Sequence, residues 1–231
     1  MATVAKPAPY RLWSSSVGKK ILMAVSGLIL YGFVVVHMVG NLKVYQGREA
    51  FNHYAEGLRT VGAPFFGYGQ LLWIARIILL AALFVHLAAV FQLTRQSRAA
   101  RRHGYKKFEG LEFSRASRTM LWGGLLLLAY VVYHLLHLTF GSVHPNFIPG
   151  DAYNNFVVGF QQPPAALAYI VAMIPLGLHM YHGFWSMLQT LGANNPKYNK
   201  LRRPFALVLS LLVVLLNISF PVAVLLGWLT L

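Results

Sequence analysis

The sequence of 231 residues contains no cysteine and only five acidic residues, and charged residues make up 11% of it. The absence of cysteine excludes disulfide bonds, thiolate metal sites and covalent haem attachment through a CxxCH motif. Soluble domains carry about 25% charged residues, so the low charge argues against a soluble domain. The sequence also lacks Walker, GxGxxG and nucleophile-elbow motifs, which removes the nucleotide-binding and hydrolase classes that those motifs mark.

Apolar residues make up 57% of the chain and gather in long blocks. Five blocks reach the roughly 20 residues that cross about 30 Å of hydrocarbon. They lie at about residues 21–42, 70–94, 120–139, 164–191 and 205–229. Because helices satisfy their backbone groups internally, we predict one all-α integral membrane domain of five transmembrane helices over residues 1–231. The first block is too long for a signal peptide and lacks a small-residue cleavage site, so we interpret it as a retained span.

The formal net charge of +15 is distributed unevenly between the two sides of these spans. If the N-terminus is cytoplasmic, segments 1–20, 95–118 and 192–204 face inward and hold 16 of the 20 Lys and Arg residues. The outer segments, 43–69 and 140–163, hold three basic and three acidic residues. The positive-inside rule therefore predicts a cytoplasmic N-terminus and an outside C-terminus in the cell's inner membrane, with no nucleic-acid partner. The basic inner surface, RQSRAARRHGYKKF above all, could also bind anionic lipid or a peripheral protein.

Histidine is unusually frequent within the predicted spans. Six of the nine histidines lie there, and the fifth span has none. They are His37, His86, His134, His137, His179 and His182. Ionisable groups inside a membrane are costly and are functional-site hypotheses by default, although a single histidine can be only an interhelical hydrogen-bonding group. Because four of the five spans carry at least one histidine, a functional site is favoured over isolated hydrogen-bonding groups.

Two of these spans carry histidine in the outer half of the membrane. At 1.5 Å per helical residue, His37 lies about 25 Å from the inner edge at Lys20. His134 lies about 24 Å from Arg118 by the same measure, and His137 is one turn further out. The first span is therefore predicted to pair with the third.

The other two spans carry histidine in the inner half. His86 lies about 13 Å from the inner edge at Arg95, and His179 and His182 lie roughly 15 to 20 Å from Gly192. The second span is therefore predicted to pair with the fourth, and depth alone slightly prefers His182 as the partner of His86.

Two imidazoles facing each other at one depth suit bis-histidine haem b, whose iron takes one nitrogen from each side. Zinc requires further ligands, and no span carries a carboxylate or a thiol. Proton relays also use histidine, but rarely in two matched pairs. Two stacked haems would conduct electrons across the membrane.

Arg76 is the one arginine inside a predicted span. It lies about 15 Å outward of His86, at the level of the outer pair. A buried cation needs an anion, and a haem propionate is the expected partner. The alternative is that Arg76 snorkels to the outer headgroups.

Four sequence stretches together resemble one known family. They are SGLILYGFVVVHMVGNL, AFNHYAEGLR, YNNFVVGFQQP and HMYHGFWSMLQTLGANNPKY. They resemble the cytochrome b membrane anchor of succinate dehydrogenase and fumarate reductase, of the single-polypeptide, five-helix, two-haem type found in menaquinone-using bacteria. The resemblance runs from about Ser14 to the fifth span.

The resemblance selects one histidine in each span as an axial ligand. His37 is followed four residues later by Asn41, and Gly124 precedes His134 by ten residues, as in the family. In the fourth span His179 is followed by GFW at positions 183–185, and the second-span ligand matches His86. The implied pairs are His37–His134 for the outer haem and His86–His179 for the inner haem.

The third and fourth spans each carry a histidine doublet, His134 with His137 and His179 with His182. The second histidine of each doublet is then expected to lie beside the haem without binding its iron. His137 and His182 lie one turn from the ligands on nearly the same face, so depth does not exclude them. We expect each to hydrogen-bond a carbonyl group, a haem propionate or a neighbouring helix.

The resemblance also implies partners and an activity for the whole complex. A flavoprotein with FAD, which holds the succinate site, and an iron–sulfur subunit would dock on the basic inner face. Electrons would pass between the iron–sulfur clusters, the two haems b and menaquinone, as part of a respiratory chain and the tricarboxylic acid cycle. The complex could also form a higher oligomer.

The quinone site is expected near the outer haem, in the first outer segment. REAFNHYAEGLR offers Glu49, His53, Tyr54 and Glu56, and histidine titrates near neutral pH. The alternative is that this segment is an amphipathic cap with its polar residues in water. A second quinone site near the inner face, at Ser14–Ser16 or Arg11, stays open.

Two other functions compete with this prediction. One is the cytochrome b subunit of a membrane-bound hydrogenase or formate dehydrogenase, against which LQTLGANNPKY and the five spans argue. The other is a transporter or proton channel with histidine relays, against which the lack of spaced acids and inverted repeats argues.

Overall fold

Five long helices form the body of the protein, which a computed structural model describes for residues 13–100, 115–193 and 195–231. They are α2 (Ser16–Asn41), α4 (Gln70–Ala100), α5 (Arg115–His134), α7 (Pro163–Thr190) and α8 (Pro196–Leu225). A 3-10 turn, η1 (Leu42–Gln46), extends α2, and a π-helical turn, η2 (Leu135–Thr139), extends α5. All five are long and apolar enough to cross a membrane. The predicted class, an all-α multi-pass membrane protein, is confirmed.

Several helix boundaries differ from those expected from hydropathy, most of all in α4 and α8. α4 continues to Ala100, beyond the apolar block, because Arg, Gln and Ala favour helix as strongly as the apolar residues before them. α8 begins early, at Pro196, where the side chain of Asn195 accepts a hydrogen bond from the backbone N–H of Lys197. It ends at Leu225, and Gly227, at φ +73°, turns the chain out of the helix.

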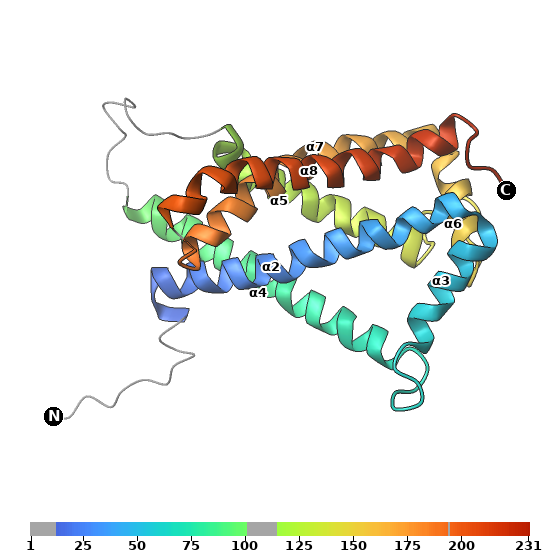
Figure 1. Cartoon of the computed structure of the whole chain (residues 1–231), viewed down its shortest axis with the longest axis horizontal. Helices are drawn as coiled ribbons and strands as arrows, with labels where there is room; N and C mark the ends of the chain where they lie inside the picture. Colours follow the sequence, from blue (N-terminus) through green and yellow to red (C-terminus); the bar gives the residue numbers. More distant parts are fainter. Residues whose placement is uncertain (1–12, 101–114, 194) are drawn as a thin grey trace.

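The long helices run back and forth along one axis, so that α2 begins at one end of the bundle and α8 ends at the other (Figure 1). α7 is the central helix, which packs against α2, α5 and α8, and α4 packs against α2. α2 and α4 diverge towards one end of the bundle (Figure 1). The pairs α2–α5 and α4–α7 are not among the closely packed ones.

Two short helices cover the end of the bundle at which α8 finishes: α3 (Arg48–Thr60) and α6 (Ala152–Phe160). We call this the outer end, after the predicted topology. α3 is amphipathic and inserts Phe51 against Phe156 of α6, with 5.7 Å between the ring centroids. The buried cluster around them includes Val44, Phe160, Tyr169 and Phe220. An amphipathic cap is the alternative that the sequence offered to a quinone site in this segment, whereas α6 was not expected from the sequence.

Asp151 ties the two short helices together. Its carboxylate caps the N-terminus of α6, accepts from Nδ2 of Asn52 at 2.9 Å and pairs with Arg48. Burial alone would raise the pKa of this carboxyl, but the hydrogen bonds from Asn52, the backbone of Asn154 and Arg48 lower it below its ordinary value. The outer cap is therefore held by charge as well as by apolar packing.

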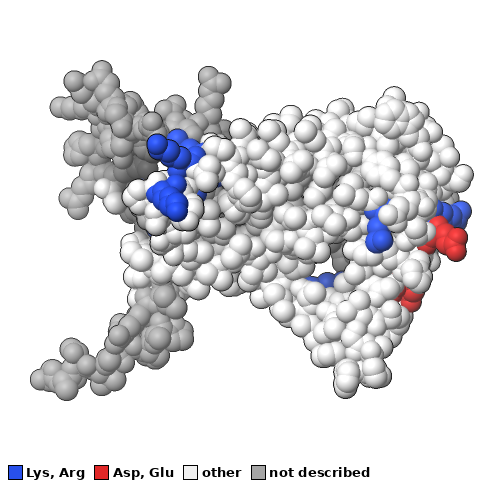
Figure 2. All heavy atoms as spheres, in the orientation of Figure 1, with Lys and Arg blue, Asp and Glu red and all other residues white. Residues whose placement is uncertain are grey.

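Among the described residues, acidic side chains lie at one end of the bundle, whereas basic side chains lie at both ends (Figure 2). Glu49, Glu56 and Asp151, the acidic residues within the described ranges, all belong to the outer cap. Basic side chains gather at the opposite end, where α8 begins (Figure 2). This distribution is the one on which the predicted orientation rests.

Candidate functional site

The outer histidine pair joins α2 to α5. The rings of His37 and His134 lie 5.9 Å apart between centroids and are nearly perpendicular, at 84°. Their helices do not pack closely against each other, so the two rings approach across a space between the helices. His37 is exposed and His134 is half-buried, which leaves both rings open to a bound group.

The inner pair joins α4 to α7 in the same way. The rings of His86 and His179 lie 6.2 Å apart between centroids, at 59°, and both are half-buried. Nδ1 of His179 is buried and has no hydrogen-bond partner among the described residues.

Both separations fit an iron atom between the rings. With metal–nitrogen bonds of about 2 Å and about 1 Å from each nitrogen to its ring centroid, two axial imidazoles have centroids about 6 Å apart. The observed 5.9 and 6.2 Å match this spacing. In the described part of the chain no three His, Asp or Glu side chains gather as metal ligands. The two pairs instead offer two ligands each, the number that haem requires.

Two glycines keep space beside the inner pair. A Cβ atom at Gly27 of α2 would lie 3.3 Å from Cε1 of His86, and one at Gly124 of α5 would lie 3.7 Å from Cε1 of His179. Each glycine precedes the outer histidine of its own helix by ten residues, Gly27 before His37 and Gly124 before His134. A side chain at either position would lie against the histidine ring that it faces, more closely at Gly27 than at Gly124. Gly124 is one of the residues that carry the family resemblance, whereas Gly27 is not, although its identical spacing before His37 could have indicated it.

His86 is oriented by the backbone of α2. Its Nδ1 lies 3.2 Å from the carbonyl oxygen of Met23 and 3.4 Å from Oγ of Ser26. The Ser26 hydroxyl donates to the carbonyl of Leu22 at 2.7 Å. Donation from Nδ1–H of His86 to the Met23 carbonyl places the lone pair on Nε2, the arrangement usual for a metal-binding histidine.

His134 is oriented by a side chain that the sequence analysis did not single out. Its Nδ1 lies 3.2 Å from the hydroxyl oxygen of Tyr169 on α7. The same hydroxyl lies 3.1 Å from Nδ1 of His137. Tyr169 belongs to no motif and is one of 12 tyrosines, so nothing in the sequence marked it.

The structure separates His137 from the outer pair. Its ring is only 1% exposed and stacks on Tyr133 at 5.4 Å and 11°. It also contacts His144 at 5.1 Å between centroids. The hydrogen bond that the sequence analysis expected of His137 is made with Tyr169.

His182 faces a different neighbour from His179. The ring of His182 contacts the ring of Trp185, with 5.1 Å between the centroids. The guanidinium of Arg203 on α8 lies over the same Trp185 ring, 5.1 Å from its centroid. The buried Nδ1 of His182 and Nε1 of Trp185 have no hydrogen-bond partner in the part of the chain that the structure describes.

Arg76 and Asn41 lie near the outer half of the bundle without contacting each other. The Arg76 guanidinium lies over the ring of Trp73, 4.8 Å from its centroid, and that ring is 60% exposed. The propionate predicted as its partner remains a prediction. Asn41 ends α2, next to Gly40, on which the Tyr54 side chain packs.

The four quinone-site candidates divide into two groups on α3. His53 and Tyr54 line a cavity of about 330 Å³ together with Lys43. Glu49 and Glu56 are exposed and do not line it.

Other contacts involve Glu56 and, at the inner end, Ser15. Oε2 of Glu56 lies 3.4 Å from Nη1 of Arg59, and a hydrogen bond to Glu56 raises the pKa of the exposed Tyr68 phenol. At the inner end the Ser15 side chain caps α2 by accepting from Gly18 N–H at 2.9 Å. Arg11 and residues 101–114, which include most of the basic inner segment, lie outside the described residues.

Comparisons of the chain with models of known protein families, with curated proteins and with solved structures found no match.

Proposed function

We propose that the chain is a dihaem cytochrome b of the membrane. The observation that carries this proposal is the presence of two histidine pairs, each bridging two helices that do not pack closely, with ring centroids 5.9 and 6.2 Å apart. His37 and His134 would hold the outer haem, and His86 and His179 the inner one.

More particularly, we propose that it is the membrane-anchor subunit of a succinate:quinone oxidoreductase in the cytoplasmic membrane. The motif resemblance supports this choice, and so does the concentration of basic residues in the inner segments, which suits docking of an iron–sulfur subunit. A flavoprotein subunit with FAD would hold the succinate site, and menaquinone would be the electron carrier in the membrane.

Each bound haem would supply an iron that gains and loses one electron. The two histidine pairs lie at different depths, about 15 Å apart along the axis, as the ten-residue offset between Gly27, which faces His86, and His37 implies, and each pair would hold one haem. The Met23 carbonyl would orient His86, and the Tyr169 hydroxyl would orient His134. The apolar helices would exclude water, so that electrons move between fixed sites with little reorganisation of the surroundings.

A spectrum of the purified protein tests the first step of this proposal. The reduced-minus-oxidised difference spectrum and a haemochrome assay should give two b-type haems per chain. A preparation that binds no haem under haem-replete expression would overturn the proposal.

The identity of the electron donor tests which complex the chain belongs to. In the intact complex, succinate should reduce both haems, whereas hydrogen and formate should reduce neither. Reduction by hydrogen or formate alone would instead place the chain in a hydrogenase or a formate dehydrogenase.

A further inference from the structure

The connection between α3 and α4 exposes aromatic side chains. It comprises residues 61–69, VGAPFFGYG, and we call it the aromatic loop. Phe65 is 92% exposed and Tyr68 is 67% exposed. The sequence has no charged residue between Arg59 and Arg76, so the loop and the first turn of α4 are uncharged. An exposed apolar patch of this kind marks a surface that another apolar phase or molecule covers.

The backbone of the aromatic loop satisfies several of its own polar groups. The N–H of Phe66 donates to the carbonyl oxygen of Gly62 at 2.9 Å. The N–H of Gly67 donates to Oε1 of Gln70 at 2.9 Å, and the N–H of Gln70 donates to the carbonyl oxygen of Gly67 at 3.1 Å. Backbone groups that are paired in this way lose less free energy when they leave bulk water, as a segment at a membrane surface must.

Gly62 holds the aromatic loop against the start of α4. Its φ of +90° belongs to the region that favours glycine. A Cβ atom at Gly62 would lie 2.5 Å from Cδ1 of Leu71, so the Leu71 side chain packs directly on the backbone of the loop. The exposed rings are therefore carried by a backbone that is fixed to a membrane helix.

The aromatic loop lies at the side of the bundle. α3 runs from the outer end of α2 back towards the start of α4, so the loop is set back from the tip of the outer end and projects sideways (Figure 1). Next to it, α4 exposes Trp73 at 60% and Ile77 at 61%. α4 is long and apolar enough to cross the membrane, and the exposed face of such a helix contacts lipid. The aromatic loop continues this face.

Two aromatic residues near Phe65 have the character of side chains at a membrane surface. The Tyr68 hydroxyl is hydrogen-bonded to Glu56 of α3, whereas the Tyr68 ring is exposed. The Arg76 guanidinium lies over the exposed ring of Trp73. Tyrosine and tryptophan favour the headgroup region, where the ring meets apolar chains and the polar atom meets water.

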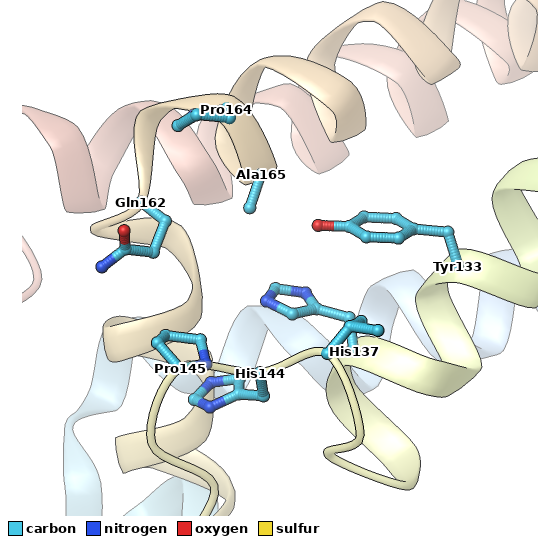
Figure 3. A pocket seen from close by; sticks show the side chains of 8 residues that line it. Tyr133, His137, His144, Pro145, Gln162, Pro164 and Ala165 are labelled. Atoms are coloured by element: carbon cyan, nitrogen blue, oxygen red, sulfur yellow. The ribbon is translucent and has the colours of Figure 1, made fainter.

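The second outer connection, residues 140–151, has a different character. It contains His144 and Asp151. The cavity of about 310 Å³ beside it is lined by the polar side chains of Tyr133 and Gln162 as well as by His144 (Figure 3). The aromatic loop contains neither a histidine nor a charged residue, so it is much less suited to contact with water.

We propose that the aromatic loop is inserted in the lipid interface beside the outer end of the bundle, with Phe65 among the acyl chains and Tyr68 among the headgroups. The lipid would hold the C-terminal end of α3, whereas Asp151 holds the other end through Arg48 and Asn52. The first outer segment, which the sequence placed outside the membrane, would thus return to lipid before α4 begins. This insertion does not depend on whether the protein binds haem.

A nitroxide spin label tests the insertion, because the natural sequence has no cysteine that would compete for the label. Phe65→Cys is labelled in the full-length protein, which is then reconstituted in vesicles of phosphatidylethanolamine and phosphatidylglycerol. Because Phe65 is 92% exposed, its replacement removes little packing. Molecular oxygen dissolves preferentially in lipid, whereas a nickel chelate stays in water. In power-saturation EPR, the label at position 65 should collide more often with oxygen than with the nickel chelate.

Glu49→Cys is the matched control, since Glu49 is an exposed charged residue at the other end of α3. The label there should collide more often with the nickel chelate than with oxygen. Two outcomes at position 65 would overturn the proposal. Greater accessibility to the nickel chelate would place the loop in water. Low accessibility to both reagents would show that protein covers the loop, either a second copy of the chain or another subunit.

Discussion

A Cβ atom at Gly27 of α2 would lie 3.3 Å from Cε1 of His86 on α4. The absence of a side chain at this point lets the ring of His86 stand against the backbone of the neighbouring helix. Gly124 of α5 faces His179 in a similar way but less closely, because a Cβ atom there would be in ordinary van der Waals contact, 3.7 Å from Cε1.

Gly27→Leu is therefore expected to reduce the haem content from two to about one per chain. The leucine side chain would press on the ring of His86 and displace it from its position opposite His179, and a tightly packed interior does not yield to added volume. A haemochrome assay on the purified protein measures the loss. Gly32→Leu, on the same helix but with open space around its Cβ position, is the control and should keep both haems. Two haems in Gly27→Leu would contradict the proposed inner site.

Replacing the two histidines of the third span separately should distinguish ligand from neighbour. His134→Ala is expected to lose the outer haem, because His134 is the ring that faces His37. His137→Ala is expected to keep two haems per chain, because His137 contacts Tyr133, Tyr169 and His144 instead. The difference spectrum of each variant gives the count, and the opposite pattern would exchange the two assignments.

Tyr169→Phe should keep both haems but raise the midpoint potential of the outer one. Without the hydroxyl, Nδ1 of His134 loses its partner, so the ring becomes a weaker electron donor to iron and stabilises the oxidised state less. A potentiometric titration of the haem spectrum measures the shift. Tyr130→Phe is the matched control, since its ring contacts His134 at 6.0 Å between centroids, and it should leave the potential unchanged. Equal potentials in Tyr169→Phe and the unmodified protein would remove Tyr169 as a positioning residue.

Asp151→Asn should lower the stability of the outer cap at neutral pH by about 1 kcal/mol or less, because the ion pair with the half-exposed Arg48 is lost. The pKa of Asp151 is lowered by folding, so its contribution is fully present above the ordinary carboxyl pKa of about 3.9. The contribution is lost as the pH falls from there through the lowered pKa of the folded state. Thermal unfolding in detergent should show the unmodified protein more stable at pH 7 and the two proteins converging at strongly acidic pH. A difference that does not depend on pH would show that the ionised carboxylate is not the cause.

The topology can be tested with single cysteines, because the natural sequence has none. Gln46→Cys, at the end of η1, should react with a membrane-impermeant maleimide on intact spheroplasts. Lys200→Cys, in the first turns of α8, should react only after the membrane is opened. The reverse pattern would invert the proposed orientation.

Hydropathy alone determined the number and the approximate position of the membrane helices. The thickness of the hydrocarbon sets a minimum length for an apolar block, and only five blocks reach it. Depth along those helices also predicted that His37 would lie near the third span and His86 near the fourth, because the rise per residue is constant. The ends of the helices followed capping groups and helix propensity, such as Asn195 before α8, to which hydropathy is blind.

Depth did not decide which histidine of each doublet faces a partner; the resemblance implied His134 and His179, and only the tertiary structure shows the contacts of each ring. His134 and His137 differ by one turn, so depth and sequence spacing are nearly equal for both, and the choice depends on how α5 is rotated and where η2 departs from α-helix. That rotation directs His134 to His37, whereas His137 lies in the cap region beside His144. It also brings Tyr169, which is 32 residues from His137 in the chain, between the two rings. Such contacts depend on side-chain packing between separate helices, and no pattern within one helix specifies them.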